Sequence, residues 1–320
     1  METQVRTPQA VFMQPQRLSV PLFQRPYVWN EENQWAPLWN DVARLADRWL
    51  ANPARRPQPH FLGAVVLQQL QRSIGALQER TIIDGQQRLT TLQLLLDALH
   101  AELQAVGATQ AAARIEALVQ NPDSYCTRPE DRFKVWPTNR DRPPFHAVMA
   151  AKPPIDYAKV GHAGERMVAA HRFFGEQARA WLAAGGSDQV QPRANAIDLV
   201  VRDQLQLVVI DLAIDENAQE IFETLNARGS PLTPADLIKN FVFQSLADDS
   251  APVEEMYRKH WQEFETGFWE TEVSLGRLRH HRSSVFLTHW LIAKTGKMTA
   301  AREVFADFSS PLKKPLPAMR

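Results

Sequence analysis

The sequence predicts an α+β fold, in which a small mixed sheet packs against helices and an appended helical region follows. Two runs rich in β-branched residues, at 61–70 and 78–83, are separated by a short polar stretch and predict a β-hairpin. A third apolar run, at 204–212, predicts a buried strand. Leucines recur at helical spacing over 86–106, directly after the hairpin, and predict a helix there.

The N-terminal half predicts three further elements. Segment 15–29 has prolines among β-favouring residues, which predicts extended chain at a sheet edge or along a groove. After Asn30, a candidate N-cap, apolar residues at three- and four-residue steps predict an amphipathic helix to about Leu50. Residues 121–164 carry prolines and charges without periodicity, which predicts an irregular excursion with short helices.

In the C-terminal half, glycines and helix caps mark where the predicted helices begin and end. A helix over 164–185 ends at two glycines, and a second helix over 216–227 stops at Gly229. Thr233, with an acidic residue three positions later, predicts the capped start of another helix. Further helices are expected over 253–306.

Two parts are therefore expected along the chain. A first domain would cover 1–248, with a helical insertion at about 107–200. A helical extension over 249–320 would lead to an effector domain that is missing or encoded separately. A length of 320 residues suffices for one large domain or two ordinary ones.

The composition indicates a globular protein that folds without disulfides or structural metal ions. Hydrophobic residues make up 44% and charged residues 22%, which excludes disordered and fibrous classes. The single cysteine, Cys126, cannot form an internal disulfide. Lys plus Arg equals Asp plus Glu at 36 each, so DNA binding would need a local basic surface. Neither a signal core nor a membrane span is visible, which predicts a cytoplasmic protein without membrane contact.

The run Asp84-Gly85-Gln86-Gln87-Arg88 lies where the hairpin passes into the next helix, so it forms a candidate anion site. Gly85 would let a phosphate approach the backbone, and Gln86 and Gln87 offer amide donors. The guanidinium of Arg88 offers several N–H donors, which can bind two phosphate oxygens at once. Asp84 could hold Mg²⁺ through water or orient a nucleophilic water. In the alternative, Asp84 is only an N-cap, Gln87 is its capping-box partner and Arg88 is a solvated residue.

A second candidate group lies at 222–232, where Asn226 and Arg228 end a helix beside Gly229. Their polar side chains could close over a bound nucleotide. The alternative is a helix C-cap followed by a new N-cap at Thr233, which leaves Asn226 and Arg228 as ordinary surface residues.

A third candidate group interleaves Gln24 and Arg25 with the aromatic residues Phe23, Tyr27 and Trp29. Aromatic faces beside an arginine suit contacts with phosphates or bases. The alternative is that Tyr27 and Trp29 anchor the segment in the core. Gln24 and Arg25 are then the better functional candidates.

Two other kinds of site find no support. A glycine-rich loop ending in Gly-Lys-Ser/Thr is absent from the sequence, which argues against an ordinary P-loop NTPase. His280 and His281 have no acidic partner at metal-ligand spacing, and their segment is predicted to be helical. We therefore do not expect this chain to hold a metal-dependent nuclease hairpin.

Four segments, in this order, resemble the N-terminal domain of GmrSD-type restriction proteins over most of residues 15–245. The segments are 21–29, 61–63, 83–91 and 222–240. That family resembles the ParB and sulfiredoxin-like fold, and its Asp-Gly-Gln-Gln-Arg motif is associated with nucleotide binding and hydrolysis. The same architecture is found in SspE-like proteins, which sense phosphorothioate DNA and restrict unmodified phage.

The resemblance and the chemistry of the side chains together give each candidate residue an expected role. The catalytic residues would be Asp84, Gln87 and Arg88, with Mg²⁺ held at Asp84. The nucleotide would be bound by Gly85, Gln86, Asn226 and Arg228. The DNA would be sensed by Phe23, Gln24, Arg25 and Tyr27.

The leading hypothesis is an NTPase that uses GTP and Mg²⁺ and couples recognition of modified DNA to a nuclease domain or subunit in anti-phage restriction. Water would attack the γ-phosphate while Arg88 stabilises charge. A homo-oligomer is compatible with this hypothesis. The first alternative is a non-catalytic ParB-like DNA-binding module that uses nucleotide as a switch. The second is an interaction scaffold that neither binds nor hydrolyses nucleotide.

Overall fold

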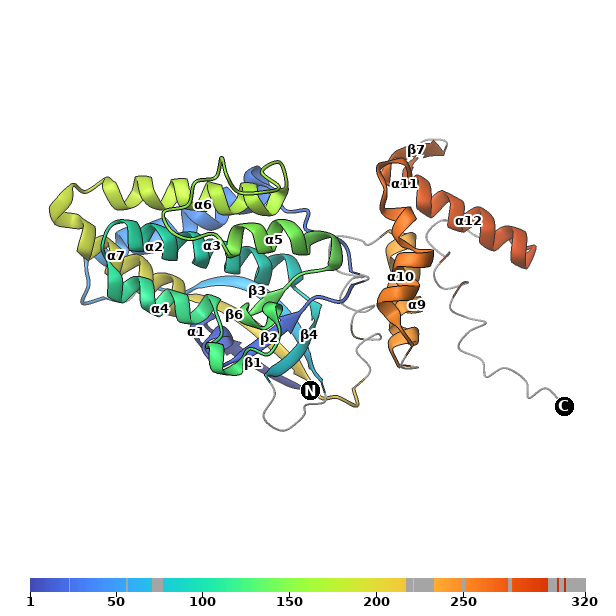
Figure 1. The fold of residues 1–320 in the computed structure, drawn as a ribbon, viewed down its shortest axis with the longest axis horizontal. Coiled ribbons are helices and arrows are strands. Elements are labelled where there is room, and N and C mark those ends of the chain that lie inside the picture. The colour runs from blue at the N-terminus through green and yellow to red at the C-terminus, as the bar shows by residue number, and fades with distance from the viewer. Residues whose placement is uncertain are drawn as a thin grey trace. The chain divides into compact units, whose positions relative to one another are not determined.

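The computed structural model describes residues 1–22, 24–55, 57–70, 77–216, 221, 233–248, 251–275, 278–298, 304 and 308. The chain divides into two units (Figure 1). The first comprises Met1–Pro21 and Pro26–Ala218, and the second comprises Leu22–Arg25 and Gln219–Arg320. This division differs from the boundary expected at residue 248, because α9 (Pro234–Asp248) belongs to the second unit.

A six-stranded mixed sheet forms the base of the first unit, which confirms the α+β class. Its strands are β1 (Glu2–Arg6), β2 (Gln16–Ser19), β3 (His60–Gln69), β4 (Gln78–Asp84), β5 (Val135–Trp136) and β6 (Leu205–Leu212). They lie in the order β1-β6-β3-β4-β2-β5. The predicted hairpin is confirmed, since β3 and β4 pair antiparallel, and the predicted strand at 204–212 is β6.

The position of β2 differs from the expected sheet edge. β2 pairs in parallel with β4 on one side and with β5 on the other, so it lies inside the sheet. The sheet edges are instead β5 and β1. Neither edge strand was predicted, because β5 has only two residues and β1 shows almost no burial pattern.

Helices stack on one face of this sheet (Figure 1). The predicted helix at 86–106 is α3 (Gln86–Ala105), and every residue from Leu89 to Leu103 is buried. It is covered because α4 (Thr109–Val119) and α6 (Arg166–Ala183) pack against it. A helix enclosed on all sides cannot show a clean amphipathic stripe, which agrees with the leucine-rich but broadly spread pattern of α3.

The other helices of the first unit lie near their predicted positions. Asn30 accepts a hydrogen bond from the amide of Asn33 at 3.0 Å and starts η1 (Glu31–Trp35), which continues into α2 (Ala36–Ala51). The helix predicted over 164–185 is α6. α7 (Val190–Leu199) was not predicted as a separate element.

Buried polar residues on α3 fasten it to α6. His171, fully buried on α6, lies 3.0 Å from Asp97 through Nε2 and 2.7 Å from the hydroxyl of Tyr157 through Nδ1. About two turns further along α6, Arg179 donates two hydrogen bonds to Glu102, at 2.9 and 2.7 Å. These pairs satisfy carboxylates that burial would otherwise penalise.

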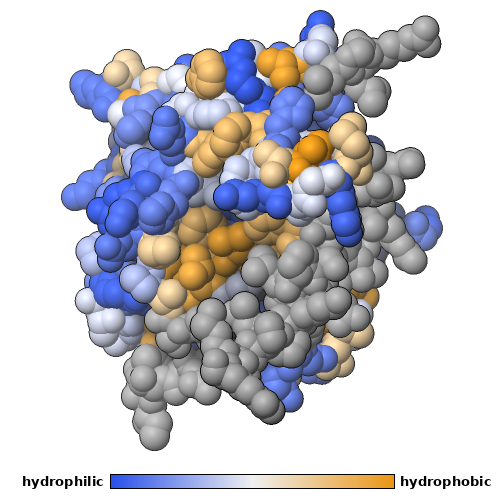
Figure 2. All heavy atoms as spheres, turned by 90° about the vertical axis from the view of Figure 1, so that its right-hand side faces the viewer, coloured by the Kyte–Doolittle hydropathy of each residue, from blue (hydrophilic) through white to orange (hydrophobic). Residues whose placement is uncertain are grey.

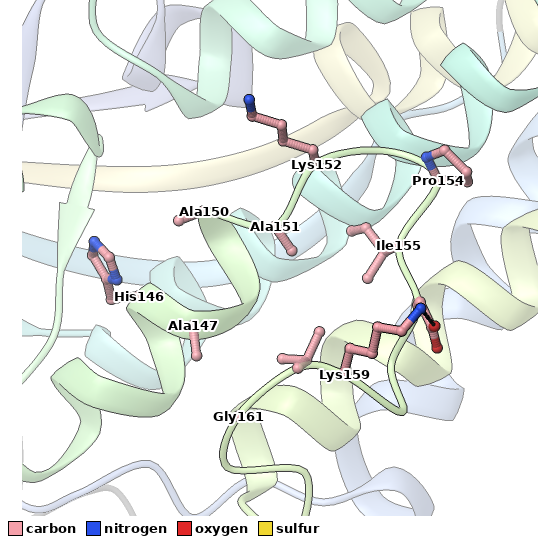
Figure 3. A pocket seen from close by; sticks show the side chains of 11 residues that line it. His146, Ala147, Ala150, Ala151, Lys152, Pro154, Ile155, Lys159 and Gly161 are labelled. Carbon is pink, nitrogen blue, oxygen red and sulfur yellow. Dashed lines mark ion pairs between the residues drawn. The ribbon is translucent and has the colours of Figure 1, made fainter.

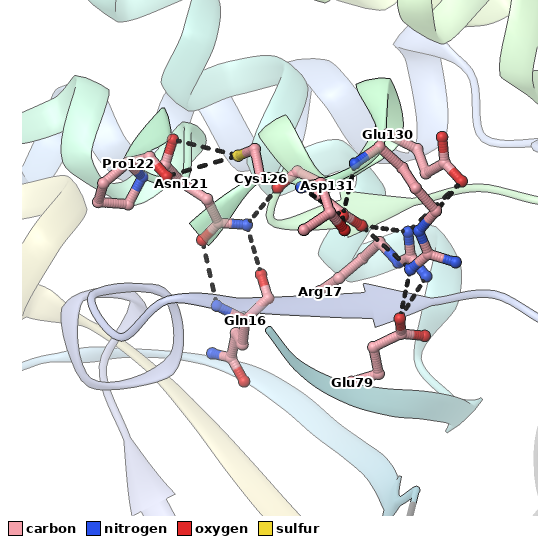
Figure 4. A network of polar contacts seen from close by, with 10 residues as sticks. Gln16, Arg17, Glu79, Asn121, Pro122, Cys126, Glu130 and Asp131 are labelled. Atoms are coloured by element: carbon pink, nitrogen blue, oxygen red, sulfur yellow. Dashed lines mark hydrogen bonds and ion pairs between the residues drawn. The ribbon is translucent and has the colours of Figure 1, made fainter. Parts of the chain in front are cut away.

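The irregular excursion at 121–164 is confirmed. It contains η2 (Asp123–Tyr125), η3 (Pro129–Arg132), η4 (Asn139–Asp141) and α5 (Arg142–Met149). A polar network joins it to β2 (Figure 4). Asn121 pairs with the backbone of Gln16 in both directions, at 2.8 and 3.1 Å. Arg17 lies 2.7 Å from both Asp131 and Glu79. The excursion also contributes β5 to the sheet, so it joins β2 by backbone pairing as well as by these side-chain contacts.

The second unit contains α9, α10 (Val253–His260), η7 (Gln262–Glu265), α11 (Gly267–Glu270) and α12 (Arg282–Thr295). Thr233 and Asp236 form the predicted capping pair, since each side chain accepts a hydrogen bond from the other residue's backbone amide. The helix expected around His280 and His281 is wrong. β7 (Glu272–Leu275) and β8 (Leu278–His281) pair antiparallel there, and polar and apolar residues alternate along β7.

Large aromatic side chains are exposed on the second unit. Phe268 is 61% exposed, Trp290 is 42% exposed and Phe286 is 41% exposed. Figure 2 shows a face on which hydrophobic residues gather among hydrophilic ones. None of the helices that the structure describes is long and apolar enough to cross a membrane.

Candidate functional site

The first feature of the site is the turn that joins β4 to α3. Gly85 has a φ of +87°, and a Cβ added to it would lie 2.6 Å from Cγ1 of Val65. The position therefore requires glycine both for its left-handed backbone and for the close approach of β3. Gly85 is also the N-cap of α3, and no side chain caps this helix. The alternative in which Asp84 and Gln87 form a capping box is therefore excluded.

Asp84 ends β4 and is half-buried. Its carboxylate makes no hydrogen bond and no ion pair with any residue in the described part of the chain. A carboxylate in this state can still bind a cation or a water molecule. Within the described residues, no group of three or more acidic, histidine or cysteine side chains could hold a metal ion. Mg²⁺ commonly takes one protein carboxylate and completes its shell with water and substrate phosphates, so Asp84 alone fits such a role.

Arg88, one helical turn away, is held against β3. Its Nη1 donates a hydrogen bond to the carbonyl oxygen of Ala64, and its guanidinium lies across Gly63. Burial lowers the pKa of Arg88, and the nearby negative charge of Asp84 opposes that shift. The group stays charged, because an arginine pKa lies far above neutrality. Arg88 is thus a positioned cation and not a solvated helix residue.

Gln87 uses its side-chain amide to hold the segment that precedes η1. Nε2 donates a hydrogen bond to the carbonyl oxygen of Pro26 at 3.0 Å, and Oε1 accepts one from the amide of Val28 at 2.8 Å. The side chain is only 7% exposed. It therefore pairs with 26–28 as a neighbouring strand would, with a donor and an acceptor to the same stretch of backbone.

Tyr27 adds a second connection between this segment and α3. Its hydroxyl lies 2.6 Å from Oγ1 of Thr91 and accepts a hydrogen bond from Nε1 of Trp35 at 2.9 Å. Thr91 donates its own hydroxyl proton to the carbonyl of Gln87, so the Tyr27 hydroxyl must be the donor to Thr91. Burial raises the pKa of Tyr27. The alternative in which Tyr27 anchors the segment in the core agrees with this burial.

The structure brings together only some of the predicted site residues. Asp84 to Arg88 and Tyr27 lie in the first unit, and Gln86 is half-buried in the first turn of α3. Gln24, which is 6% exposed, and the half-buried Arg25 belong to the second unit. Three predicted residues lie outside the described part of the chain, namely Phe23, Asn226 and Arg228.

A small cavity beside Arg88 was missed from the sequence. It has a volume of about 180 Å³, and its lining includes Trp29, Leu38, Asp41, Phe61, Arg88 and Leu92. These residues come from four separate parts of the first unit. Trp29 and Phe61 were noticed as parts of motif segments, but no local pattern indicates that they line one cavity.

A second hollow lies in the irregular excursion and shares no residue with the first. It has a volume of about 520 Å³ and is lined by α5 and the chain that follows it (Figure 3). Lys152 and Lys159 are among its lining residues, and Lys159 pairs with Asp156 at 2.9 Å.

Comparison with known proteins identifies a family for this chain. A family model described as GmrSD restriction endonuclease, N-terminal domain, matches residues 9–243. The matched region contains Gly63, the run from Asp84 to Arg88 and the cavity beside them. No curated protein matches the sequence.

Proposed function

Since the chain belongs to the family of GmrSD restriction endonuclease N-terminal domains, we propose that it hydrolyses a nucleoside triphosphate and senses modified DNA within a restriction system. The observation that carries this proposal is the pair of charged groups at the start of α3. Asp84 offers a carboxylate without a described partner, and Arg88 offers a cation fixed against β3. GTP is the nucleotide that the family resemblance implies, and phosphorothioate DNA is the corresponding candidate for the modified substrate.

The phosphates would bind at the N-terminus of α3. The first backbone amides of a helix have no acceptor within the helix, and the helix dipole favours an anion there. Gly85, as the left-handed N-cap, forms the turn that starts α3, and Gln86 lies in the first turn. Asn226 and Arg228, which lie outside the described residues, are proposed as further nucleotide ligands because their polar side chains beside Gly229 could close over a bound nucleotide.

Arg88 and Asp84 would have separate roles in the hydrolysis of the nucleotide. In the part of the chain that the structure describes, Ala64 supplies the only acceptor that Arg88 contacts, so its other N–H groups can reach phosphate oxygens. Arg88 would stabilise the charge that develops on the γ-phosphate. Asp84 would orient the attacking water. Mg²⁺, when bound through water at Asp84, would supply charge neutralisation of the phosphates.

Gln87 would act by holding a neighbouring segment of the chain in place. Both ends of its amide are engaged by Pro26 and Val28, so the proposed catalytic role becomes one of holding segment 26–28 beside the start of α3. Segment 26–28 directly follows Gln24 and Arg25, the candidates for sensing DNA together with Phe23. Tyr27 would contribute to sensing as the anchor of this segment.

The engagement of Gln87 also favours a second function. If the Gln87 amide cannot assist the attacking water, nucleotide could bind at Asp84 and Arg88 without turnover and serve as a switch. Both functions require nucleotide binding, and only the first requires release of phosphate.

The test is phosphate release from each NTP by the purified chain with Mg²⁺, with and without modified DNA. We expect Arg88→Ala to abolish hydrolysis while its circular dichroism spectrum and unfolding midpoint stay near those of the wild type. Arg48→Ala, at an exposed arginine near the end of α2, is the matched control. Unchanged turnover in a folded Arg88→Ala variant would contradict the NTPase proposal. Nucleotide binding without turnover by the wild type would support the switch.

A further inference from the structure

The cavity beside Arg88 is bounded by elements that lie far apart in the sequence. Leu38 and Asp41 come from α2, Phe61 from β3, and Arg88 and Leu92 from α3. With a volume of about 180 Å³, it is smaller than the pockets of roughly 300 to 1,000 Å³ that enclose whole ligands. It suits one planar ring system, with the remainder of the ligand outside.

The walls of the cavity are mostly apolar. Trp29, Leu38, Phe61 and Leu92 contribute aromatic and aliphatic surface. Phe61 is 57% exposed although it belongs to a sheet strand, so its ring offers an uncovered face to a ligand. Bases stack on such rings, and alanine substitutions show that each stack contributes about 1–3 kcal/mol.

Four polar residues also line the cavity, and Asp41 is the only acidic one among the lining residues. Asp41 lies 3.2 Å from Nε2 of His60 through Oδ2 and contacts Arg44 through Oδ1. Each carboxylate oxygen can accept two hydrogen bonds, so Asp41 can take two more donors while it keeps both partners. An acceptor-only group at the edge of an apolar slot selects a ring with N–H groups on its edge.

We propose that this cavity takes the base of the nucleotide and that Asp41 selects guanine. The inference rests on the proposed nucleotide-binding function and adds the site of base recognition. Guanine presents two adjacent donors, N1–H and the N2 amino group, which match the two oxygens of a carboxylate. Adenine would place its N1 acceptor against the same oxygens, and two unpaired acceptors facing each other are costly.

The position of Arg88 connects this base site to the phosphate site. Arg88 belongs to the first turn of α3 and also borders the cavity. A single nucleotide would therefore have its base on one side of the guanidinium and its phosphates on the other, at the helix N-terminus. Both parts of the ligand lie within the first unit.

The test is Asp41→Asn, assayed with GTP, ITP, ATP and XTP for binding by titration calorimetry and for hydrolysis. The amide of the variant can donate to the C2 carbonyl of xanthine and loses one acceptor for guanine. We expect GTP binding to weaken at least tenfold, XTP binding to strengthen, and kcat at saturation to change little. ITP, which lacks the N2 amino group, should bind the wild type more weakly than GTP does.

Two further variants complete the design. Asp47→Asn is the matched control. Asp47 lies on the same helix as Asp41, but it accepts a hydrogen bond from Trp181 at 3.1 Å outside the cavity. The base preference of this variant should therefore match that of the wild type. Leu38→Trp fills the cavity and should weaken binding of all four nucleotides. If the wild type binds GTP while Asp41→Asn and Leu38→Trp retain its affinities and its preference, the base site is overturned and the proposed function stands. If the wild type binds no nucleotide, both are overturned.

Discussion

Gly63 and Arg88 occupy adjoining space: a Cβ on Gly63 would lie 2.6 Å from Nη2 of Arg88 and 2.7 Å from its Cζ. Gly63 also has a φ of +107°, where residues with a side chain are strained. The glycine of β3 therefore sets where the cation of the candidate site can lie. Gly63 and the Asp84–Arg88 run both lie within the region that the family model matches.

Gly63→Ala should displace Arg88 and reduce NTP turnover at least tenfold, with a loss of about 1–3 kcal/mol of folding stability from backbone strain. Gly107→Ala is the control, because Gly107 has a φ of +75° but nothing within 4 Å of its added Cβ. Both variants should lose stability in urea denaturation, and only Gly63→Ala should lose turnover. Full activity in Gly63→Ala would show that the position of Arg88 does not matter.

Gln87→Ala should release the segment at 26–28, because its amide holds both the Pro26 carbonyl and the Val28 amide. We expect faster hydrogen exchange in peptides covering 26–29 and a stability loss of about 1–3 kcal/mol from the unpaired groups. Gln93→Ala is the matched control on α3, since Gln93 donates to the carbonyl of Leu118 instead. Equal exchange at 26–29 in both variants would argue against the anchoring role.

Lys134 should make stability depend on alkaline pH. It is fully buried, its Nζ donates to the carbonyl of Gln14 at 3.0 Å, and burial lowers its pKa from 10.5 to about 8. Between these values the unfolded chain holds a proton that the folded protein has lost, so the free energy of unfolding rises with pH. The rise should be on the order of 2 kcal/mol, allowing for solvent screening of the amine.

Urea denaturation of Lys134→Met at pH 7 and pH 9.5 tests this effect. The variant should lack the alkaline rise that the wild type shows, because it has no amine to titrate. Lys152→Met, at an exposed lysine, should keep the rise. A wild type whose stability stays flat or falls over this range would contradict the lowered pKa.

The buried group of Asp97, His171 and Tyr157 should be structural although its residue types occur in catalytic sites. Both ring nitrogens of His171 are engaged, and the ring is fully buried between α3 and α6. Tyr157→Phe should reduce stability by about 1 kcal/mol, and His171→Ala by about 2–4 kcal/mol. Turnover per folded molecule should equal that of the wild type in Tyr157→Phe. A tenfold loss of kcat without a loss of stability would assign the group to catalysis.

The chain alone should not nick supercoiled plasmid in the presence of NTP and Mg²⁺ or Mn²⁺. His281 lies at the end of β8, and its Nδ1 pairs with the carbonyl of Glu270 at 2.8 Å, so this nitrogen is engaged within the hairpin region. Hydrolysis of a phosphodiester by a histidine-dependent metal nuclease needs a histidine base and a metal held by further side chains. Metal-dependent nicking that survives Asp84→Ala and disappears in His281→Ala would contradict this prediction.

The sequence by itself determined the elements whose signals are local. The leucine spacing of α3, the cap at Asn30, the pair Thr233 and Asp236 and the hairpin of β3 and β4 were all predicted, because helix and hairpin contacts join residues close in the chain. The Asp84–Arg88 run was also visible as a candidate anion site, since it lies between a predicted strand and the start of a predicted helix.

The tertiary structure decided which groups meet. β2 lies inside the sheet because its parallel neighbours come from residues near 80 and 135, and no local pattern records such pairings. Gln87 faces the backbone at 26–28, Arg88 lies across Gly63, and Asp41 reaches the cavity beside Arg88. Each of these contacts joins segments that are 20 or more residues apart. The side-chain partners of the site therefore follow from packing, while the sequence periodicity shows only which faces are buried.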